Sequence, residues 1–384
     1  MAGIYLHIPF CKQACSYCDF YFVTRTTLRP DFVRALIAEI RSWRETAFAE
    51  SEIETIYLGG GTPSQLTLRE LEEIFRALDE TFQIRGDEVT MELNPDDVSR
   101  SYLQGLRTLG VNRASMGVQS FDEERLRFMN RAHTSSEAHK ALGLLASEGF
   151  SSYTADLIYG CPGQTDKGLN EDLNQLMQYD PPHLSAYALT IEPRTRLGKQ
   201  LEMGRLEPAD EEQVASQMQY IVDRLRNEGV HRYEVSNFSR PGCEALHNRR
   251  YWDHSGYLGM GPSAHSFLWD GEGARRWANS PDLNRYIRSW SGGAVSVSDE
   301  PEWLSDLQLA EERLMLGLRT VHGVSLRELE DRYHYPLTLD QLEWIEKMES
   351  ENLLKKEGEQ IRLTDAGIAI SDHLVLELLR RFDE

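Results

Sequence analysis

The sequence predicts an α/β protein: an incomplete (β/α)6 barrel of the TIM type, followed by a smaller C-terminal α+β module. In the first half of the chain, short β-rich runs alternate with helical stretches of 3.6-residue period, which is typical of repeated βα units around a parallel sheet. From about Leu307 this alternation gives way to three helical stretches, two short strand-like runs around Gly358 and a last helix beginning at Thr364.

Six strands and five intervening helices are expected in the barrel. The strands are expected at residues 3–8, 53–58, 88–93, 113–118, 152–158 and 183–189, and the helices at 30–46, 68–81, 99–109, 135–148 and 168–179. Several of the helices begin after a Ser, Thr or Asp residue, which can cap free backbone N–H groups. Right-handed crossovers between parallel strands would curl the six units into an incomplete barrel.

Three parts of the chain are predicted from these patterns. Residues 1–235 form the partial barrel, 236–300 a connecting segment, and 301–384 the C-terminal module, which resembles a winged helix. A further helix is expected at 209–227. Residues 310–384 carry 10 basic and 17 acidic side chains, a net charge of −7, which is the wrong sign for a phosphate-binding face. We therefore expect the module to pack or dock rather than to bind DNA.

The overall charge and hydropathy narrow the class of protein further. With 41 Lys and Arg against 62 Asp and Glu in 384 residues, the net charge is −21, which argues against a nucleic-acid partner. No apolar stretch reaches the roughly 20 residues of a membrane span, and the start MAGIYLHIPFC lacks the basic and long apolar regions of a secretory signal. The sequence thus predicts a cytoplasmic protein without a membrane span.

Three of the five cysteines lie within eight residues. Cys11, Cys15 and Cys18 have the spacing C-x3-C-x2-C and follow the first strand, at the end of the barrel where active sites lie. Three thiolates on one loop can hold three irons of a [4Fe-4S] cluster and leave the fourth iron open. A zinc site completed by His7 or Asp19 is the alternative.

Other strand ends carry further polar and glycine-rich motifs at the same rim. They are Gly59-Gly60-Gly61-Thr62-Pro63, Glu92-Leu93-Asn94-Pro95, Gly117-Val118-Gln119-Ser120-Phe121 and Asp156. Together with the cysteine spacing, this set resembles the radical S-adenosylmethionine (SAM) enzymes. In that family the methionine end of SAM chelates the open iron, and an electron from the reduced cluster can cleave SAM to a deoxyadenosyl radical. Glycines there let backbone N–H groups approach the ligand closely.

Nearly the whole chain, from the opening YLHIPFC to the C-terminal module, resembles the oxygen-independent coproporphyrinogen III oxidase branch of this superfamily. The resemblance implies a common role for nine residues, which is contact with SAM; some of them would contact a second SAM. These residues are Tyr5, Tyr17, Gly60, Gly61, Thr62, Glu92, Gln119, Arg131 and Asp156. Packing in the first strand is the alternative role for Tyr5, and a solvated cation at a helix end is the alternative for Arg131.

Two departures separate the chain from the oxidase. The oxidase has another cysteine two residues after the third, where this chain has Phe20, and residues 247–252 read H-N-R-R-Y-W in an expected loop. This H-N-x-x-Y-W string is similar to that of the HemW-type haem chaperones, which implies haem as a ligand and His247 as its leading axial ligand. His254, His265 and His7 are rival ligands. Cys161 and Cys243 are expected to be free buried thiols.

The sequence therefore favours a haem chaperone that holds a [4Fe-4S] cluster through Cys11, Cys15 and Cys18, binds SAM, and passes haem to haem proteins such as respiratory enzymes. A homodimer is left open. The main alternative is a radical SAM oxidase that decarboxylates two propionates of coproporphyrinogen III in porphyrin biosynthesis. An acidic scaffold protein with zinc in its cysteine loop is the third hypothesis.

Overall fold

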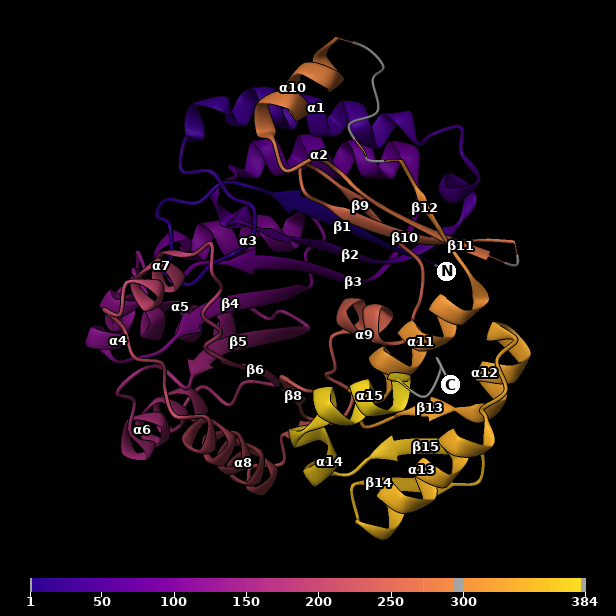
Figure 1. The fold of residues 1–384 in the computed structure, drawn as a ribbon. Coiled ribbons are helices and arrows are strands. Elements are labelled where there is room, and N and C mark those ends of the chain that lie inside the picture. The colour runs from indigo at the N-terminus through magenta and orange to yellow at the C-terminus, as the bar shows by residue number, and fades with distance from the viewer. Residues whose placement is uncertain (1, 272, 293–297, 299, 381–384) are drawn as a thin grey trace.

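The structure is a computed structural model that describes residues 2–271, 273–292, 298 and 300–380. Its main feature is a 12-stranded sheet with the order β12-β11-β10-β9-β1-β2-β3-β4-β5-β6-β8-β7. Six parallel strands lie side by side in chain order in this sheet (Figure 1). They are β1 (Ala2–Ile8), β2 (Glu52–Gly60), β3 (Gln83–Leu93), β4 (Arg113–Gln119), β5 (Ser152–Tyr159) and β6 (His183–Ala188). The sheet ends in the edge strands β12 and β7, so the incomplete barrel is confirmed.

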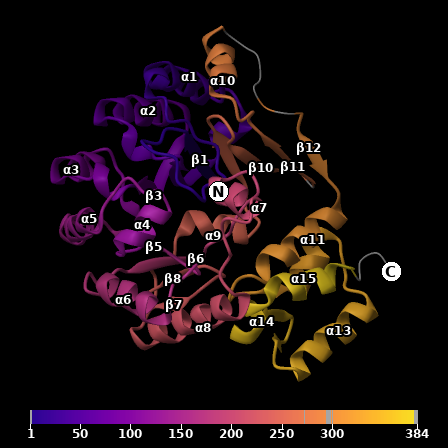
Figure 2. The ribbon, with the colours of Figure 1, turned by 60° about the vertical axis from the view of Figure 1, so that its left-hand side comes forward.

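Helices cover the outer face of these strands, as Figures 1 and 2 show. They are α1 (Arg29–Ser42), α2 (Leu68–Thr81), α3 (Arg100–Thr108), α5 (Ser135–Ser147), α6 (Asp166–Met177) and α8 (Glu211–Asn227). Two shorter helices, α4 (Glu123–Phe128) and α7 (Arg196–Glu202), lie near the carboxyl ends of the strands. Thr67 and Thr134 form capping boxes before α2 and α5, as expected from their hydroxyl groups. The short helices α4 and α7 were not predicted. None of the helices in the described residues is long and apolar enough to cross a membrane.

The register of the parallel strands brings their carboxyl ends to one edge of the sheet. Ile8 of β1 lies opposite Gly60 of β2, and Leu93 of β3 lies opposite Met116 of β4. Because side chains alternate between the two faces of a strand, this register also aligns the side chains that point into the barrel. The loops that follow β1 to β5 therefore surround one region of the molecule.

The sheet extends beyond the six expected strands at both edges. β9 (Tyr257–Met260) pairs parallel with β1, and the added antiparallel strands are β10 (His265–Asp270), β11 (Gly273–Ala278), β12 (Glu302–Leu304), β7 (His231–Arg232) and β8 (Asn237–Ser239). Within predicted segment 236–300, strands β8 to β11 thus belong to the large sheet. The segment also carries α9 (Leu246–Trp252) and α10 (Leu283–Ser291).

The C-terminal module has the three helices, the two strands and the helix after Thr364 that were expected, and it also has a short strand, β13 (Val324–Ser325), and a second helix at its end, which were not. It consists of α11 (Asp306–Gly317), β13, α12 (Leu326–Tyr333), α13 (Leu339–Ser350), β14 (Leu354–Glu357), β15 (Gln360–Leu363), α14 (Asp365–Ala369) and α15 (Ser371–Leu379). Its antiparallel sheet has the order β13-β15-β14. The core of the module includes Phe267 and Ala274 of the large sheet. Burial of apolar surface therefore joins the two parts.

Candidate functional site

The cysteine loop, residues 11–18, leaves the carboxyl end of β1 and carries three free, partly exposed thiols. Side-chain ion pairs hold it on two sides. Lys12 pairs with Asp96 at 2.8 Å and with Asp97 after β3, and Asp19 pairs with Arg194 at 3.0 Å before α7. Burial raises the pKa of Cys11 to about 11 and that of Cys18 to about 12. Without a bound cation the thiols of Cys11 and Cys18 therefore stay protonated at neutral pH.

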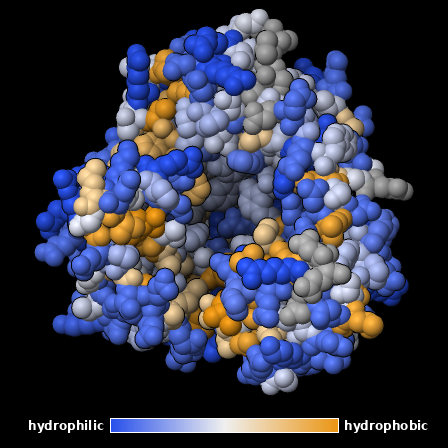
Figure 3. Space-filling view, in the orientation of Figure 1, coloured by the Kyte–Doolittle hydropathy of each residue, from blue (hydrophilic) through white to orange (hydrophobic). Residues whose placement is uncertain are grey.

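The cysteine loop closes one side of a cavity of about 470 Å³. Figure 3 shows a hollow in the face of the molecule beside α9, near the centre of the view. The cavity brings together most of the residues that the sequence indicated for cluster and SAM binding: Cys11, Cys15, Tyr17, Cys18, Gly60, Gly61, Thr62, Glu92, Gln119, Arg131 and Asp156. The carboxyl ends of β1 to β5 thus meet at one site, as their motifs predicted.

Tyr5 and His247 do not line this cavity. The Tyr5 ring stacks on Tyr57 at a centroid distance of 6.1 Å, and its hydroxyl is hydrogen-bonded with His7 Nδ1 at 3.2 Å. Tyr57 itself lines the cavity, so Tyr5 lies behind the wall. The predicted SAM contact of Tyr5 stays a prediction, and the packing alternative is the role that these contacts describe.

Several lining residues were missed by the sequence analysis, among them Arg113, Ser115, Thr154, Ser185 and Tyr187. They occupy every second position of β4, β5 and β6, with the same spacing as Gln119 on β4 and Asp156 on β5, because every second side chain of a barrel strand points inward. The signal was present in the sequence: polar residues recur at every second position of strands that are otherwise apolar. Applying the two-residue period to the expected strands would have found them.

The glycines after β2 are required by close packing. Gly60 has a φ of +107°, and a Cβ atom there would lie 2.5 Å from the His7 ring. A Cβ atom on Gly61 would lie 2.8 Å from the Ile8 carbonyl oxygen, which is backbone and cannot turn aside. The β2 turn therefore passes directly against β1, next to the cysteine loop.

Glu92 of β3 and Asp156 of β5 place two carboxyl groups in the lining of the cavity. Glu92 accepts a hydrogen bond from the Tyr57 hydroxyl at 2.8 Å and from the Gly60 N–H at 3.2 Å. Burial, with a smaller contribution from the negative charge of Asp156, raises the pKa of Glu92 to about 7. Burial likewise raises the pKa of Asp156 to about 6. Two buried carboxyl groups favour a positively charged ligand, which would restore both to the ionised form.

Arg131 links the cysteine loop to the strand ends. Its guanidinium lies 3.4 Å from Cys15 Sγ and 3.5 Å from the Tyr17 hydroxyl, and it donates hydrogen bonds to Asn94 Oδ1 at 2.8 Å and to the Gly117 carbonyl at 2.9 Å. The expected alternative of a solvated helix-end cation is therefore wrong. A fixed positive charge here can stabilise thiolate sulfur and an anionic ligand group.

His247 lies on α9 and not in a loop, which corrects the sequence-based expectation. The helix begins without a local cap, because Ala245 has no polar side chain, and the carboxylate of Glu88 on β3 accepts hydrogen bonds from the N–H groups of Leu246 at 2.8 Å and His247 at 3.0 Å. A carboxylate is a strong cap for free N–H groups at a helix start. Since this cap comes from 158 residues away, the local pattern did not reveal the helix.

The His247 ring is fully buried beside the cavity wall. It stacks on Tyr57 at 5.3 Å, and its two nitrogens are hydrogen-bonded with Thr55 Oγ1 and with the Tyr251 hydroxyl, each at 2.9 Å. The next residue, Asn248, lines the cavity. Burial lowers the pKa of His247 to about 3, with Arg113 contributing, so the ring stays neutral near pH 7.

This lowered pKa predicts an acid-sensitive contribution to stability. Unfolded His247 takes up a proton below about pH 6.5, whereas folded His247 does so only near pH 3, so the free energy of unfolding falls as the pH drops through this window. The cost approaches about 1.4 kcal/mol per pH unit. Urea unfolding of wild type and His247→Gln between pH 4 and pH 7 should give the variant a smaller dependence on pH. Equal slopes in the two proteins would contradict the prediction.

The rival histidines have other contacts. His7 Nε2 is hydrogen-bonded with the Tyr21 carbonyl at 2.8 Å, and buried His254 pairs with Tyr333 of the C-terminal module at 3.2 Å, whereas His265 is exposed. Cys161 is buried and Cys243 is half-buried; both are free, as expected.

The residues of the cavity fit the two groups that the cysteine motif implies. Thiols are the protein ligands of iron–sulphur clusters, and all three cysteines of the loop reach the same cavity. Among the buried polar atoms that have no hydrogen-bond partner in the protein are two from residues lining the cavity beside the cysteines and the strand ends, Gln119 Oε1 and Arg131 Nε. Buried polar atoms are rarely left unpaired, so both are available to a ligand. Cys11, Cys15 and Cys18 would hold the cluster, and Glu92, Gln119, Arg131 and Asp156 would contact SAM.

Known proteins resemble the chain in both of its parts. Residues 5–176 match the Radical SAM superfamily and residues 304–370 match the HemN C-terminal domain. The chain is 33% identical over 377 residues to "Heme chaperone HemW" of Lactococcus lactis subsp. lactis (strain IL1403), covering 98% of this chain and 96% of that protein. It is 35% identical over 267 residues to "Heme chaperone HemW" of Escherichia coli (strain K12), covering 68% of this chain and 69% of that protein.

A solved structure has the same fold. The coproporphyrinogen III oxidase (HemN) from Escherichia coli, described as a radical SAM enzyme, matches with a TM-score of 0.84 and 24% identity, covering 98% of this chain and 89% of that chain. At this identity the likeness concerns the fold.

Proposed function

We propose, from the premise that the chain belongs to the HemW family within the radical SAM superfamily, that this protein is a cytoplasmic haem chaperone. It binds a [4Fe-4S] cluster and SAM in the cavity, takes up haem, and delivers it to haem-accepting proteins such as respiratory enzymes. When bound, the cluster and SAM supply one-electron chemistry. The protein holds the cluster and SAM through the three thiols of the cysteine loop, the carboxyl groups of Glu92 and Asp156, and Arg131.

The observation that carries the haem part is the position of the H-N-x-x-Y-W string. Asn248 lines the cavity, and His247 stacks on Tyr57, which lines it too. An axial histidine must be neutral, and the pKa of about 3 keeps this ring neutral near pH 7. Ligation by Nε2 requires that Tyr251 release its hydrogen bond to that atom. The proposal therefore includes a rearrangement of α9 when haem binds.

Phe20 favours the chaperone over the oxidase alternative. It stands two residues after Cys18, where the oxidase has a cysteine. Phe20 is one of the residues that line the cavity, and it is 74% exposed. A phenyl ring supplies no thiol, and exposed aromatic surface at a cavity suits a flat apolar ligand.

A haem titration followed by the Soret band, run beside an assay of coproporphyrinogen III turnover with SAM and reductant, tests the proposal. We expect stoichiometric haem binding without turnover in the wild type. His247→Gln should bind haem about tenfold more weakly while it keeps the hydrogen bonds of the fold, since glutamine lacks the imidazole ligand. Tyr251→Phe should bind at least as tightly as the wild type, because Nε2 is then free.

His373→Ala is the matched control, because it removes an exposed histidine of α15 that is not among the residues lining the cavity. Its haem affinity should equal that of the wild type. Turnover to protoporphyrinogen would replace the chaperone assignment with the oxidase. Zinc in place of iron in a colourless, anaerobically reconstituted protein would instead support the scaffold alternative.

A further inference from the structure

The cysteine loop rests on the turn that ends α4. Ser16 N–H donates a hydrogen bond to the Met129 carbonyl at 2.9 Å, and the Ser16 hydroxyl donates to the Phe128 carbonyl at 3.0 Å. Asn130 Nδ2 donates to the Ala14 carbonyl at 2.7 Å. These contacts lie on both sides of Cys15. The path of the loop therefore depends on where the end of α4 is held.

The same turn also sets the position of Arg131. The Arg131 N–H donates to the Leu126 carbonyl of α4 at 2.9 Å, and the side chain then reaches Cys15 Sγ at 3.4 Å. Hydrogen bonds to cluster sulfurs and the net charge around a cluster tune its reduction potential. A shift of α4 would thus move the loop and its neighbouring cation together.

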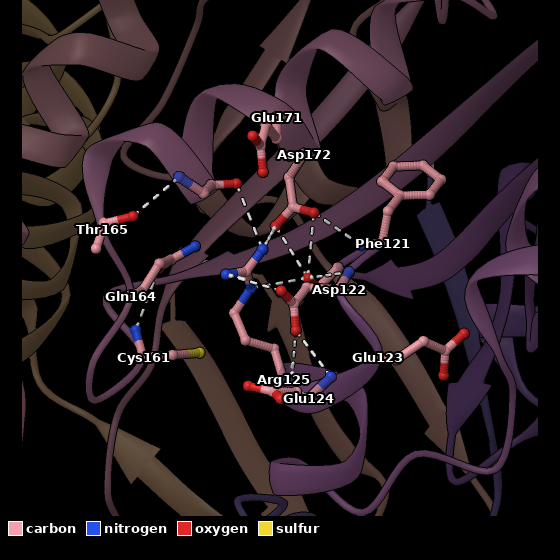
Figure 4. Close-up of polar contacts among 12 residues, drawn as sticks. Phe121, Asp122, Glu123, Glu124, Arg125, Cys161, Gln164, Thr165, Glu171 and Asp172 are labelled. Carbon is pink, nitrogen blue, oxygen red and sulfur yellow. Dashed lines mark hydrogen bonds and ion pairs between the residues drawn. The ribbon is translucent and has the colours of Figure 1, made fainter.

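A helix of six residues does not hold itself in place, because short helices are marginal without tertiary contacts. For α4 these contacts converge on Asp172 of α6 (Figure 4). The Asp172 carboxylate accepts hydrogen bonds from the Ser120 hydroxyl at 2.9 Å, the Phe121 N–H at 2.8 Å and Arg125 at 3.1 Å. Ser120 and Phe121 lie between β4 and α4, and Arg125 belongs to α4 itself.

This group, which we name the Asp172 network (Asp172, Ser120, Phe121 and Arg125), is enclosed by protein. Asp172 is 2% exposed and Ser120 is fully buried. Arg125 Nε also donates to the Ser120 hydroxyl at 3.0 Å, so each side chain is fixed by another. Removing one partner of a buried charged pair leaves the other uncompensated, which is strongly destabilising for the local arrangement. The network therefore fixes the entry to α4.

We propose that Asp172 is a positioning residue for the cluster site, although it lies outside the cavity. Through Arg125 and the turn before α4, it holds residues 129–131 against the cysteine loop and so maintains the contact between Arg131 and Cys15. The inference rests on the proposed binding of a cluster and SAM. The Asp172 network also holds the chain directly after Gln119. Gln119 has a φ of +67° and lines the cavity.

Asp172→Asn tests the inference, since asparagine keeps the shape and one acceptor oxygen but loses the charge that holds Arg125. The matched control is Glu171→Gln, the same loss of charge at the preceding residue, whose side chain is 57% exposed. Each protein is reconstituted anaerobically, and iron content, SAM affinity, the midpoint potential and the EPR spectrum of the reduced cluster with and without SAM are measured.

We expect Asp172→Asn to keep its circular dichroism spectrum and its iron, but to bind SAM about tenfold more weakly, as supporting residues around metal sites typically do when replaced. Its midpoint potential should become more negative because the cation near Cys15 is less well fixed, and its EPR spectrum should respond less to SAM. Glu171→Gln should match the wild type in all four measurements.

Unchanged SAM affinity, potential and spectrum in Asp172→Asn would overturn the inference, while normal loading of the wild type would leave the proposed function intact. A wild type that takes up no cluster would remove both. If Asp172→Asn does not fold, Arg125→Lys decides, because lysine keeps the positive charge but lacks the planar fork that reaches Asp172 and Ser120 together. The same shift is expected there, and wild-type behaviour would count against the inference.

Discussion

We expect Cys15→Ala to lose the visible absorption of the proposed cluster and to hold well below four irons per chain after anaerobic reconstitution. Cys15 is the middle cysteine of the loop, and the Arg131 guanidinium lies 3.4 Å from its sulfur atom. Without the Cys15 thiol, only two thiols of the loop remain to bind iron. Solvent would then reach the iron that Cys15 would have bound. The measurement is the absorption spectrum together with iron and sulfide analysis.

Cys243→Ala is the control for this change, because it also removes a free, partly buried thiol but lies outside the cavity. Its spectrum and iron content should equal those of the wild type. A full complement of iron in Cys15→Ala would exclude the assignment of the loop as the cluster ligand. Equal loss in both variants would point to general damage from lost thiols.

Most of the barrel and of the cavity could be predicted because both follow from local patterns. Strand β1, with the sequence AGIYLHI, is buried on both faces and reads as a nearly continuous apolar run. Motifs at the carboxyl ends of such strands necessarily meet, as Ile8 and Gly60 do. The same two-residue period would also have indicated Arg113 and Tyr187, had it been followed inward from the rim.

Features that depend on distant partners could not be predicted from local patterns. The start of α9 is capped by Glu88, and without that carboxylate the segment after Ala245 has the composition of a loop. The strands β9 to β12 are short, and β10 approaches β9 so closely that a Cβ atom on Gly259 would lie 2.0 Å from the His265 carbonyl oxygen. The pairing of these strands depends on side chains packed around them in the folded sheet. It therefore leaves little two-residue alternation of apolar and polar residues in their sequence.

The position of His247 illustrates the same limit at the site itself. The H-N-x-x-Y-W string identifies the residue, but its contacts with Thr55 and Tyr57 come from β2, far away in the chain. Only the folded arrangement shows that Nε2 of His247 is hydrogen-bonded with the Tyr251 hydroxyl, a contact that the proposed haem ligation would have to break. The sequence motif can thus indicate a candidate ligand residue, but it does not reveal the hydrogen bonds that the side chain makes in the folded protein.

We expect Glu92→Gln to weaken the proposed SAM binding by about 10- to 100-fold, which corresponds to one charged hydrogen bond of about 1.5–3 kcal/mol. Glutamine has nearly the same shape and can still accept the hydrogen bond from Tyr57, but it cannot ionise to meet a cationic ligand. Equilibrium dialysis or calorimetry with cluster-loaded protein measures the loss. Tyr57→Phe is the control, since it removes one hydrogen bond to the carboxylate and keeps its charge; its affinity should change much less.

The pH dependence of binding separates this role from a packing role. With a pKa raised to about 7, Glu92 is only partly ionised near neutrality, and a cation favours its ionised form. Affinity in the wild type should therefore rise with pH between 6 and 8, because fewer carboxyl groups must lose a proton on binding. In Glu92→Gln this rise should flatten, leaving only the smaller contribution of Asp156, whose pKa of about 6 lies at the lower end of the range. A variant with the same slope as the wild type would show that Glu92 does not face the cationic ligand.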